Sequence, residues 1–247
     1  MGELTQIIKL DATDSTNLYL KDLMSSTTVK DYTTVVAKKQ NKGRGQMGTE
    51  WNTEEGKNLT FSILKKFESL EAEGQFRLNI VVSLALHTVL TDLDIPNVKI
   101  KWPNDIMSGT KKICGILIEN VINGNVVKKS IIGIGLNVNQ TSFGNLTKAS
   151  SLSLVTQKTF DLDYVLQLIL EKMRALLDNL EKMPFALLQT QYEPLLFRKD
   201  QVSTFKMGER DVFPGIIRGV SEEGKLLVEL ENGSLRDFSL KEVSLQI

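Results

Sequence analysis

Short segments rich in apolar and β-branched residues recur through the first part of the chain and predict β-strands. The expected strands are residues 5–10, 33–38, 59–65, 98–101, 113–121 and 126–138. Other segments have apolar residues at helical spacing instead, so strands and helices alternate along the chain. This alternation predicts an α+β or α/β domain.

Three helices are expected from the same pattern. The first begins near Asp14, Ser15 and Thr16, which are N-cap candidates, and continues into leucines spaced to form one buried face. Its start is therefore expected to present free backbone N–H groups. Residues 75–93 and 162–180 predict two longer helices that pack on the sheet through their apolar faces.

The pattern changes after residue 201, where short β-rich segments are separated by turns. These segments are QVSTFK, VFPGIIRGV, KLLVEL and LRDFSL, and the turns are MGERD, SEEGK and ENGS. They predict a small all-β barrel of about 45 residues. A boundary at 195–201 thus divides the chain into a first domain of residues 1–197 and a second of residues 198–247.

Composition and charge limit what these domains do. The 247 residues include 30 basic and 30 acidic side chains, so the molecule has no overall field to attract nucleic acid or anionic lipid. Any bound anion must be held locally. The start of the sequence lacks a basic segment followed by an apolar one, and no apolar run approaches the roughly 20 residues that cross a bilayer. We therefore expect a cytoplasmic protein.

Two residue types that often carry chemistry occur once each. The single cysteine, Cys114, cannot form an internal disulfide or a cysteine-based zinc cluster, and we expect it in the core. The single histidine, His87, lies within an expected helix and excludes a histidine-rich metal site. It also argues against a hydrolase triad.

The segment 38–51 is too rich in glycine and basic residues for a simple turn between two strands. Its three glycines allow close approach of the backbone to a ligand, and Arg44 offers donors for a carboxylate or phosphate. The segment matches neither the phosphate-binding loop G-x-x-x-x-G-K-[ST] nor the dinucleotide motif G-x-G-x-x-G before a helix. A solvated basic loop is the alternative. Trp51 argues against that alternative because it could cover an apolar ligand or an adenine ring.

Three further segments carry candidate chemistry. In residues 99–105, a short strand ends in a proline turn that contains Asn104 and Asp105. Asn104 could hold a ligand, and Asp105 could bind a metal or orient an amine. The alternative is that both residues only stabilise an ordinary turn. In 111–119, Lys112 lies where an apolar strand begins and could reach into a pocket, or could simply be solvated. The glycines in 131–139 leave space for a ligand or another backbone.

Together these segments resemble the signatures of biotin protein ligases in order and spacing. The matching motifs are Asp14-Ser15-Thr16-Asn17, Gln40 to Gly48 with Trp51, Lys101 to Asp105, Lys112 to Leu117, and Gly133 to Asn137. The trailing β-rich segment resembles the SH3-like C-terminal domain of that family. The resemblance implies an α+β catalytic domain, with a mixed sheet backed by helices, similar to class II aminoacyl-tRNA synthetases and lipoate ligases.

The resemblance also implies the reaction. Such a ligase joins the biotin carboxylate to the α-phosphate of ATP, and a lysine of a biotin carboxyl carrier domain attacks the resulting biotinyl-5′-AMP. The implied cofactors are ATP, Mg²⁺ and biotin as substrate, the partner is the carrier domain of a biotin-dependent carboxylase, and a homodimer is common in the family. Neutralising the two approaching anions would require cations such as Arg44, Lys112 and Mg²⁺.

Particular residues receive roles from the resemblance. The implied catalytic residues are Lys112, Arg44 and Asp105, the last placed to bind the incoming lysine or to help remove its proton. The implied biotin-binding residues are Ser15, Thr16, Asn17, Gln40, Gly43, Arg44, Gly45, Gln46, Lys112 and Gly115. The implied ATP-binding residues are Arg44, Gln46, Trp51, Asn104, Lys112 and Asn137. No protein ligand for a resident metal is assigned.

Two departures from the family pattern affect the expected function. Many members have arginine after Gly-Arg-Gly, whereas this chain has Gln46, so we hypothesise that the adenylate is retained less well and labels bystander lysines. The catalytic signature begins by residue 14, which leaves no room for the N-terminal winged helix of bifunctional members, so we expect no nucleic-acid binding. A lipoate protein ligase and a non-catalytic biotin-sensing module are the alternative functions.

Overall fold

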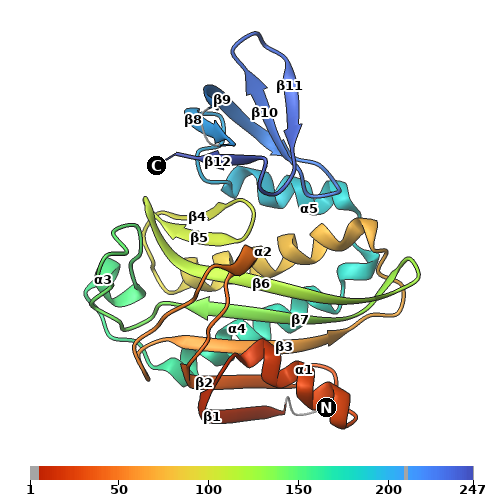
Figure 1. Ribbon diagram of the computed structural model, residues 1–247, viewed down its shortest axis with the longest axis vertical. Helices are drawn as coiled ribbons and strands as arrows, with labels where there is room; N and C mark the ends of the chain where they lie inside the picture. The colour runs from red at the N-terminus through yellow and green to blue at the C-terminus, as the bar shows by residue number, and fades with distance from the viewer. Residues whose placement is uncertain (1–5, 209–210, 247) are drawn as a thin grey trace.

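The computed structural model describes residues 6–208 and 211–246, which form a seven-stranded sheet, a five-stranded sheet and the helices around them (Figure 1). The larger sheet has the order β1-β2-β3-β7-β6-β5-β4, in which β1 and β2 are parallel and all other neighbours are antiparallel. Its strands are β1 (Ile7–Thr13), β2 (Thr34–Gln40), β3 (Leu59–Lys66), β4 (Val98–Lys101), β5 (Asp105–Ser108), β6 (Lys111–Asn123) and β7 (Val126–Leu136). The sheet is therefore mixed, as the resemblance implies.

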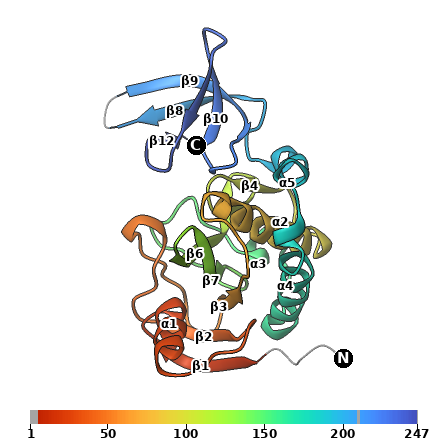
Figure 2. The same ribbon diagram turned by 90° about the vertical axis from the view of Figure 1, so that its right-hand side faces the viewer.

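Helices cover both faces of this sheet. Figure 2 shows α2 (Phe76–Asp92) and α4 (Leu162–Leu177) on one face and α1 (Thr16–Ser26) on the other. The inner strand β3 is consequently buried almost along its whole length: Phe61 and Ile63 join the larger core with α2 and α4, while Leu64 joins a smaller core with Leu20 of α1. Burial of each such side chain contributes about 1.5–3 kcal/mol to folding. The two cores fix α1 and β3 against each other.

The expected elements of this domain are present, together with several short ones that the sequence analysis did not predict. Thr5, the first residue of the first expected strand, lies outside the described residues. The sequence analysis did not predict β5 or the helix α5 (Phe185–Tyr192), because each is short and has consecutive apolar residues without a clear period. Short helical turns complete the chain: α3 (Leu152–Thr156) and the 3₁₀ turns Gln46–Gly48, Glu73–Gln75, Leu180–Lys182 and Glu193–Leu195. No described helix has both the length and the apolar composition needed to span a bilayer.

The second domain is an antiparallel five-stranded sheet with the order β11-β10-β9-β8-β12. Its strands are β8 (Val202–Met207), β9 (Asp211–Val220), β10 (Leu226–Leu230), β11 (Leu235–Phe238) and β12 (Val243–Leu245). The first four coincide with the expected segments. The three-residue β12 was missed because it is too short to show a period, yet it closes the edge of the sheet next to β8.

The second domain sits at the β4–β5 end of the larger sheet, above α2 and α5 (Figure 1). Trp102 donates its indole N–H to the backbone carbonyl of Gly224 at 2.9 Å, which joins the two domains directly. Glu193 accepts the backbone N–H of Val220 at 3.0 Å. A Cβ on Gly219 would lie 2.0 Å from the Glu193 carboxylate, so the contact requires glycine there. These contacts hold the second domain over one end of the first.

Tyr192 lies at this junction and supplies a stability prediction. Its ring packs edge-on against Phe76 with the centroids 6.2 Å apart, but its buried hydroxyl has no hydrogen-bond partner in the described parts of the chain. We expect Tyr192→Phe to leave the free energy of unfolding unchanged or to raise it by up to about 1 kcal/mol, because an unpaired buried polar atom is removed. Urea denaturation measures the change.

Tyr32→Phe is the matched control. The Tyr32 hydroxyl donates to Asp178 at 2.5 Å, so its removal breaks a hydrogen bond to a carboxylate and should cost about 1–2 kcal/mol. A loss of stability in Tyr192→Phe as large as that in Tyr32→Phe would contradict the assignment of an unpaired Tyr192 hydroxyl.

Candidate active site

A cavity of about 500 Å³ opens on the face of the large sheet that carries α1 and reaches the second domain. Its lining comes from the start of α1, the β2–β3 connection, the β4–β5 turn, the middle of β6 and β7, and the segment before and within β12. The predicted site residues that line it are Ser15, Thr16, Asn17, Gln40, Arg44, Gly45, Gln46, Trp51, Asn104, Asp105, Lys112 and Gly115. Segments that are far apart in sequence therefore meet in one pocket.

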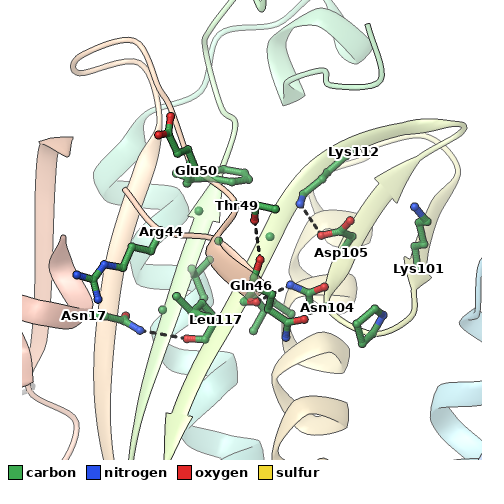
Figure 3. A pocket seen from close by; sticks show the side chains of 18 of the residues that line it. Asn17, Arg44, Gln46, Thr49, Glu50, Lys101, Asn104, Asp105, Lys112 and Leu117 are labelled. Atoms are coloured by element: carbon green, nitrogen blue, oxygen red, sulfur yellow. Dashed lines mark hydrogen bonds and ion pairs between the residues drawn. The ribbon is translucent and has the colours of Figure 1, made fainter. Parts of the chain in front are cut away.

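One end of the cavity is lined mainly by hydroxyl and amide side chains, with Arg44 beside Asn17 (Figure 3). Thr16 donates its backbone N–H to Oε1 of Gln40 at 2.8 Å, and the Asn17 Oδ1 accepts from the Ser62 hydroxyl at 2.6 Å. Asn17 also donates its amide to Glu119 at 2.6 Å. Ser15 is the N-cap residue of α1, but its hydroxyl does not cap the helix. The start of the helix thus offers several fixed donors and acceptors to a neutral polar ligand.

Lys112 and Asp105 form the charged centre of the cavity. Their Nζ and Oδ1 atoms lie 2.6 Å apart, and both side chains are largely withdrawn from solvent (Figure 3). Lys112 enters from the first residues of β6 and Asp105 from the first residue of β5, two strands that are neighbours in the sheet. An ammonium held in this position by a carboxylate is a preorganised partner for an incoming anion.

Glycines on β6 and β7 make room for the side chains above them. A Cβ on Gly135 would lie 2.3 Å from the Trp51 indole, and one on Gly115 would lie 3.1 Å from the same ring and 3.3 Å from the Lys112 ammonium. A Cβ on Gly133 would similarly lie 2.3 Å from the Asn17 amide. The sequence analysis inferred that these glycines leave space, and the structure shows that side chains from other segments fill it.

Trp51 closes the glycine-rich segment over the strands. Its backbone N–H donates to the Gly43 carbonyl at 2.9 Å, and its ring centre lies 5.4 Å from the Lys112 ammonium. Its indole N–H is buried and has no partner among the described residues. Arg44 and Glu50 pair as an isolated antiparallel bridge, which narrows the segment into a hairpin-like loop. The loop is therefore anchored at its base rather than being an unattached solvated segment.

Asn104 is held by the strand next to it. Its Nδ2 donates to the Ile116 carbonyl at 2.8 Å, and its own carbonyl accepts the Ile116 N–H at 2.9 Å. The Trp102–Pro103 peptide that precedes it is cis. The turn and β6 thus fix Asn104 in the wall of the cavity, beside Asp105 (Figure 3).

Two predicted site residues do not line the cavity. Gly43 is buried beneath the loop, where a Cβ would lie 2.1 Å from the Trp51 carbonyl, so its place is to let the loop close. Asn137 is buried at the end of β7 and donates its amide to the Ser150 carbonyl at 2.9 Å. Its side chain supports the segment that follows β7. Direct contacts of these two residues with biotin or ATP stay predictions from the resemblance.

Several lining residues were not predicted. They are Thr49, Glu50, Lys101, Trp102, Pro103, Ile116, Leu117, Gly133, Ile134, Gly135, Leu240, Lys241, Val243 and Ser244. Those in the first domain lie within or beside the quoted motifs, so a wider reading of each motif would have included them. The four from the second domain had no signal, because sequence alone does not show which end of the small sheet faces the first domain.

Lys101 has an unusual environment within the wall. Burial lowers the pKa of its ammonium; Asp105 opposes this effect, whereas the positive charges of Lys112 and Lys148 lower the pKa further.

His87 and Cys114 lie outside the cavity lining. The His87 ring contacts the Val98 carbonyl at 3.2 Å, and Cys114 is fully buried with a thiol pKa raised by burial, as expected for a core residue. The described residues contain no cluster of three or more histidine, cysteine or acidic side chains suited to a metal ion.

Comparison with known families identifies this arrangement. Residues 10–137 match the model of the biotin/lipoate A/B protein ligase family. The chain belongs to this family. Residues 204–245 match the biotin protein ligase C-terminal domain. The resemblance to biotin protein ligases and the expected fold class are thereby confirmed.

Individual relatives agree with this assignment. The bifunctional ligase/repressor BirA of Bacillus spizizenii is 30% identical over 246 residues, with 97% of this chain and 73% of the relative covered. A biotin–[acetyl-CoA-carboxylase] ligase of Paracoccus denitrificans is 34% identical over 131 residues, covering 52% of this chain and 53% of that one. The biotin protein ligase of Aquifex aeolicus in complex with biotin and ATP superposes with a TM-score of 0.80 at 29% identity, covering 98% of this chain and 99% of that chain.

Proposed function

We propose that this chain is an ATP-dependent biotin protein ligase that forms biotinyl-5′-AMP and transfers biotin to a lysine of a biotin carboxyl carrier domain. The observation that carries this function is the Lys112–Asp105 pair at the centre of a cavity whose one end is lined mainly by hydroxyl and amide side chains. A neutral head group at that end would bring an attached carboxylate to the ammonium. Relatives described as biotin ligases, and the solved ligase complex with biotin and ATP, support the same reaction.

The polar end suits the ureido ring of biotin. A urea group is uncharged and presents one acceptor oxygen and two N–H donors, so it needs both donors and acceptors from the protein. The side chains of Ser15, Thr16, Asn17 and Gln40 supply both kinds, and we assign the ureido ring to them. Apolar lining residues such as Ile116 and Leu117 would contact the remaining hydrocarbon of the ligand.

Adenylation then takes place beside Lys112. The biotin carboxylate and the α-phosphate repel each other, and a preorganised ammonium between them lowers the energy of the transition state in which they bond. Arg44 lines the same cavity and would add a second positive charge. Trp51 and Asn104, which flank Lys112, are the proposed contacts of the adenosine part. A magnesium ion is expected to accompany the phosphates of ATP, and the carboxylates of Asp105 and Glu50, which line the cavity, are the protein groups that would hold it.

Transfer to the carrier uses Asp105 in our proposal. The attacking lysine must lose a proton before its amine can act as a nucleophile. Asp105 is the acidic side chain at the centre of the cavity, so it would bind the incoming ammonium and accept or pass on that proton.

Incubation with biotin, ATP and an apo carrier domain tests the proposed function. We expect one added biotinyl group on the carrier lysine, measured by mass spectrometry. Lipoylation instead, or no modification, would contradict it.

Gln46 supplies a prediction about retention of the intermediate. Its side chain lines the cavity at the start of the 3₁₀ turn, where an arginine would place a charge near the adenylate phosphate. We expect the wild-type chain to label unrelated proteins in the presence of biotin and ATP. Gln46→Arg should lower this bystander labelling by at least about tenfold, because a charge-assisted hydrogen bond would hold the phosphate. Western blotting with streptavidin measures it, with carrier biotinylation as the reference.

Absence of bystander labelling by the wild-type chain would contradict this hypothesis, as would equal labelling by Gln46→Arg. Two other properties also belong to the proposal: the ligase acts in the cytoplasm and binds no nucleic acid. A gel shift at low salt that revealed sequence-specific binding would contradict the last of these.

A further inference from the structure

Lys101 is a cation of the cavity wall that shares its neighbouring carboxylate, Asp105, with Lys112. It faces Asp105 across the β4–β5 pair, yet the Asp105 carboxylate is bound to Lys112 at 2.6 Å. Among residues 6–208 and 211–246, no carboxylate forms an ion pair with the Lys101 ammonium. Burial and the charges of Lys112 and Lys148 together disfavour its charged form, as the direction of its pKa shift indicates. A partly buried ammonium of this kind is stabilised when an anion binds next to it.

Lys101 lies at one end of the cavity. Figure 3 shows Lys101 beyond Asp105 and Lys112, on the side away from Asn17. Lys101 also lines a smaller cavity of about 170 Å³ between the two domains, together with Val243 and Ser244 of β12. Lys241 of the second domain lines the main cavity as well. The main cavity is therefore lined by lysines from both domains, and Lys101 lies at the end opposite Asn17.

The chemistry of adenylation predicts an anion at this end, provided that the proposed function holds. A carboxylate oxygen forms a bond to the α-phosphorus while the bond from that phosphorus to the α,β-bridging oxygen breaks, and its electron pair leaves with pyrophosphate. Attacking and leaving oxygens lie roughly in line across the phosphorus. Because biotin is held at the Asn17 end, its carboxylate approaches from that side. Pyrophosphate then departs toward the opposite end, where Lys101 lies.

We propose that the Lys101 ammonium binds the β- and γ-phosphates of ATP and the departing pyrophosphate, with Lys241 as a second contact from the other domain. Lys101 then acts in adenylate formation and in its reversal. It has no part in the transfer of biotin to the carrier, because pyrophosphate has left before that step. Lys112 differs from Lys101 because it lies where the bond between the carboxylate and the α-phosphorus forms.

The test separates the two half-reactions in the full-length chain. We expect Lys101→Met to lower biotin-dependent ATP–pyrophosphate exchange by about 100-fold and to raise the KM for pyrophosphate, because one charged contact to the leaving group is lost. Transfer from chemically prepared biotinyl-5′-AMP to an apo carrier domain should change by less than about threefold. Lys101→Arg should retain most of the exchange, since it keeps the charge.

Lys99→Met is the matched control. Lys99 lies two residues earlier on the same strand and donates to the Pro194 carbonyl at 3.2 Å, outside the main cavity. The substitution Lys99→Met removes the same charge as Lys101→Met and should leave both half-reactions unchanged.

Two results would overturn the inference: exchange in Lys101→Met that stays near the wild-type level, or an equal loss in exchange and in transfer. If wild-type protein showed no biotin-dependent exchange, the proposed function would fail first and the inference with it. Failure of the proposed function would thus be seen in the wild-type protein, whereas failure of the inference alone would be seen in the Lys101→Met variant.

Discussion

Lys112→Met should lower the rate of biotinyl-5′-AMP formation by about three orders of magnitude, the largest effect that we expect from any single substitution. The ammonium lies at the centre of the cavity, bound to Asp105 at 2.6 Å, and no other lysine of the described chain occupies that position. Without it, the carboxylate and the α-phosphate would meet beside the uncompensated negative charge of Asp105. Single-turnover formation of the adenylate from biotin and ATP measures the loss.

Lys111→Met provides the control for that substitution. Lys111 is the preceding residue on β6, is exposed, and donates its ammonium to the Thr147 carbonyl outside the cavity. Its replacement should leave adenylate formation within about twofold of wild type, because an exposed charge away from the site has little effect. A fall in Lys112→Met no larger than that in Lys111→Met would remove Lys112 from the proposed mechanism.

Gly135→Ala should destabilise the protein by about 2 kcal/mol, the second large effect, because a methyl group is forced into occupied space. The new Cβ would lie 2.3 Å from the Trp51 indole, a rigid ring that is itself anchored through the Gly43 carbonyl. The indole must then move away from β7, which should also weaken ATP binding. Urea denaturation followed by tryptophan fluorescence measures the stability, and the KM for ATP measures the consequence for the site.

A double-mutant cycle with Trp51→Ala tests the cause. If the clash with the indole is responsible, Gly135→Ala should cost less than about 0.5 kcal/mol once the indole is absent, so the two changes will be strongly non-additive. Gly124→Ala is a useful comparison, since no atom lies within 4 Å of its added Cβ and only its positive φ of 60° opposes the change. Additive costs of Gly135→Ala and Trp51→Ala would contradict the packing argument.

Much of the fold could be predicted from the sequence because apolar residues repeat at regular spacing in its strands and long helices. The boundaries of β3, β4 and β7 and of α2 and α4 lie within a few residues of the expected ones. The order of the strands could not be derived in this way, since pairing between β3 and β7 brings together residues about seventy positions apart. Short elements such as β5 and β12 escaped because a few residues show no period.

The candidate site shows the same division between local and distant information. Lys112, Asp105 and the glycine-rich loop were found because each lies in a chemically unusual segment. That Lys112 pairs with Asp105, and that Trp51 covers Gly135, depends on strands meeting in space. Asn137 was assigned to ATP from its motif, whereas its side chain donates to the Ser150 carbonyl and lies behind the cavity wall. Lys241 could not have been found, because its place in the wall depends on how the two domains meet.

The central claim is that the cavity around Lys112 activates biotin with ATP. ATP–pyrophosphate exchange by the purified wild-type chain tests it most directly, with biotin, with lipoate and with no added acid. We predict exchange that requires biotin and that Lys112→Met lowers by about three orders of magnitude. Exchange supported by lipoate but not by biotin would instead indicate a lipoate ligase, and no exchange with either acid would indicate a binding module; both results would contradict the account.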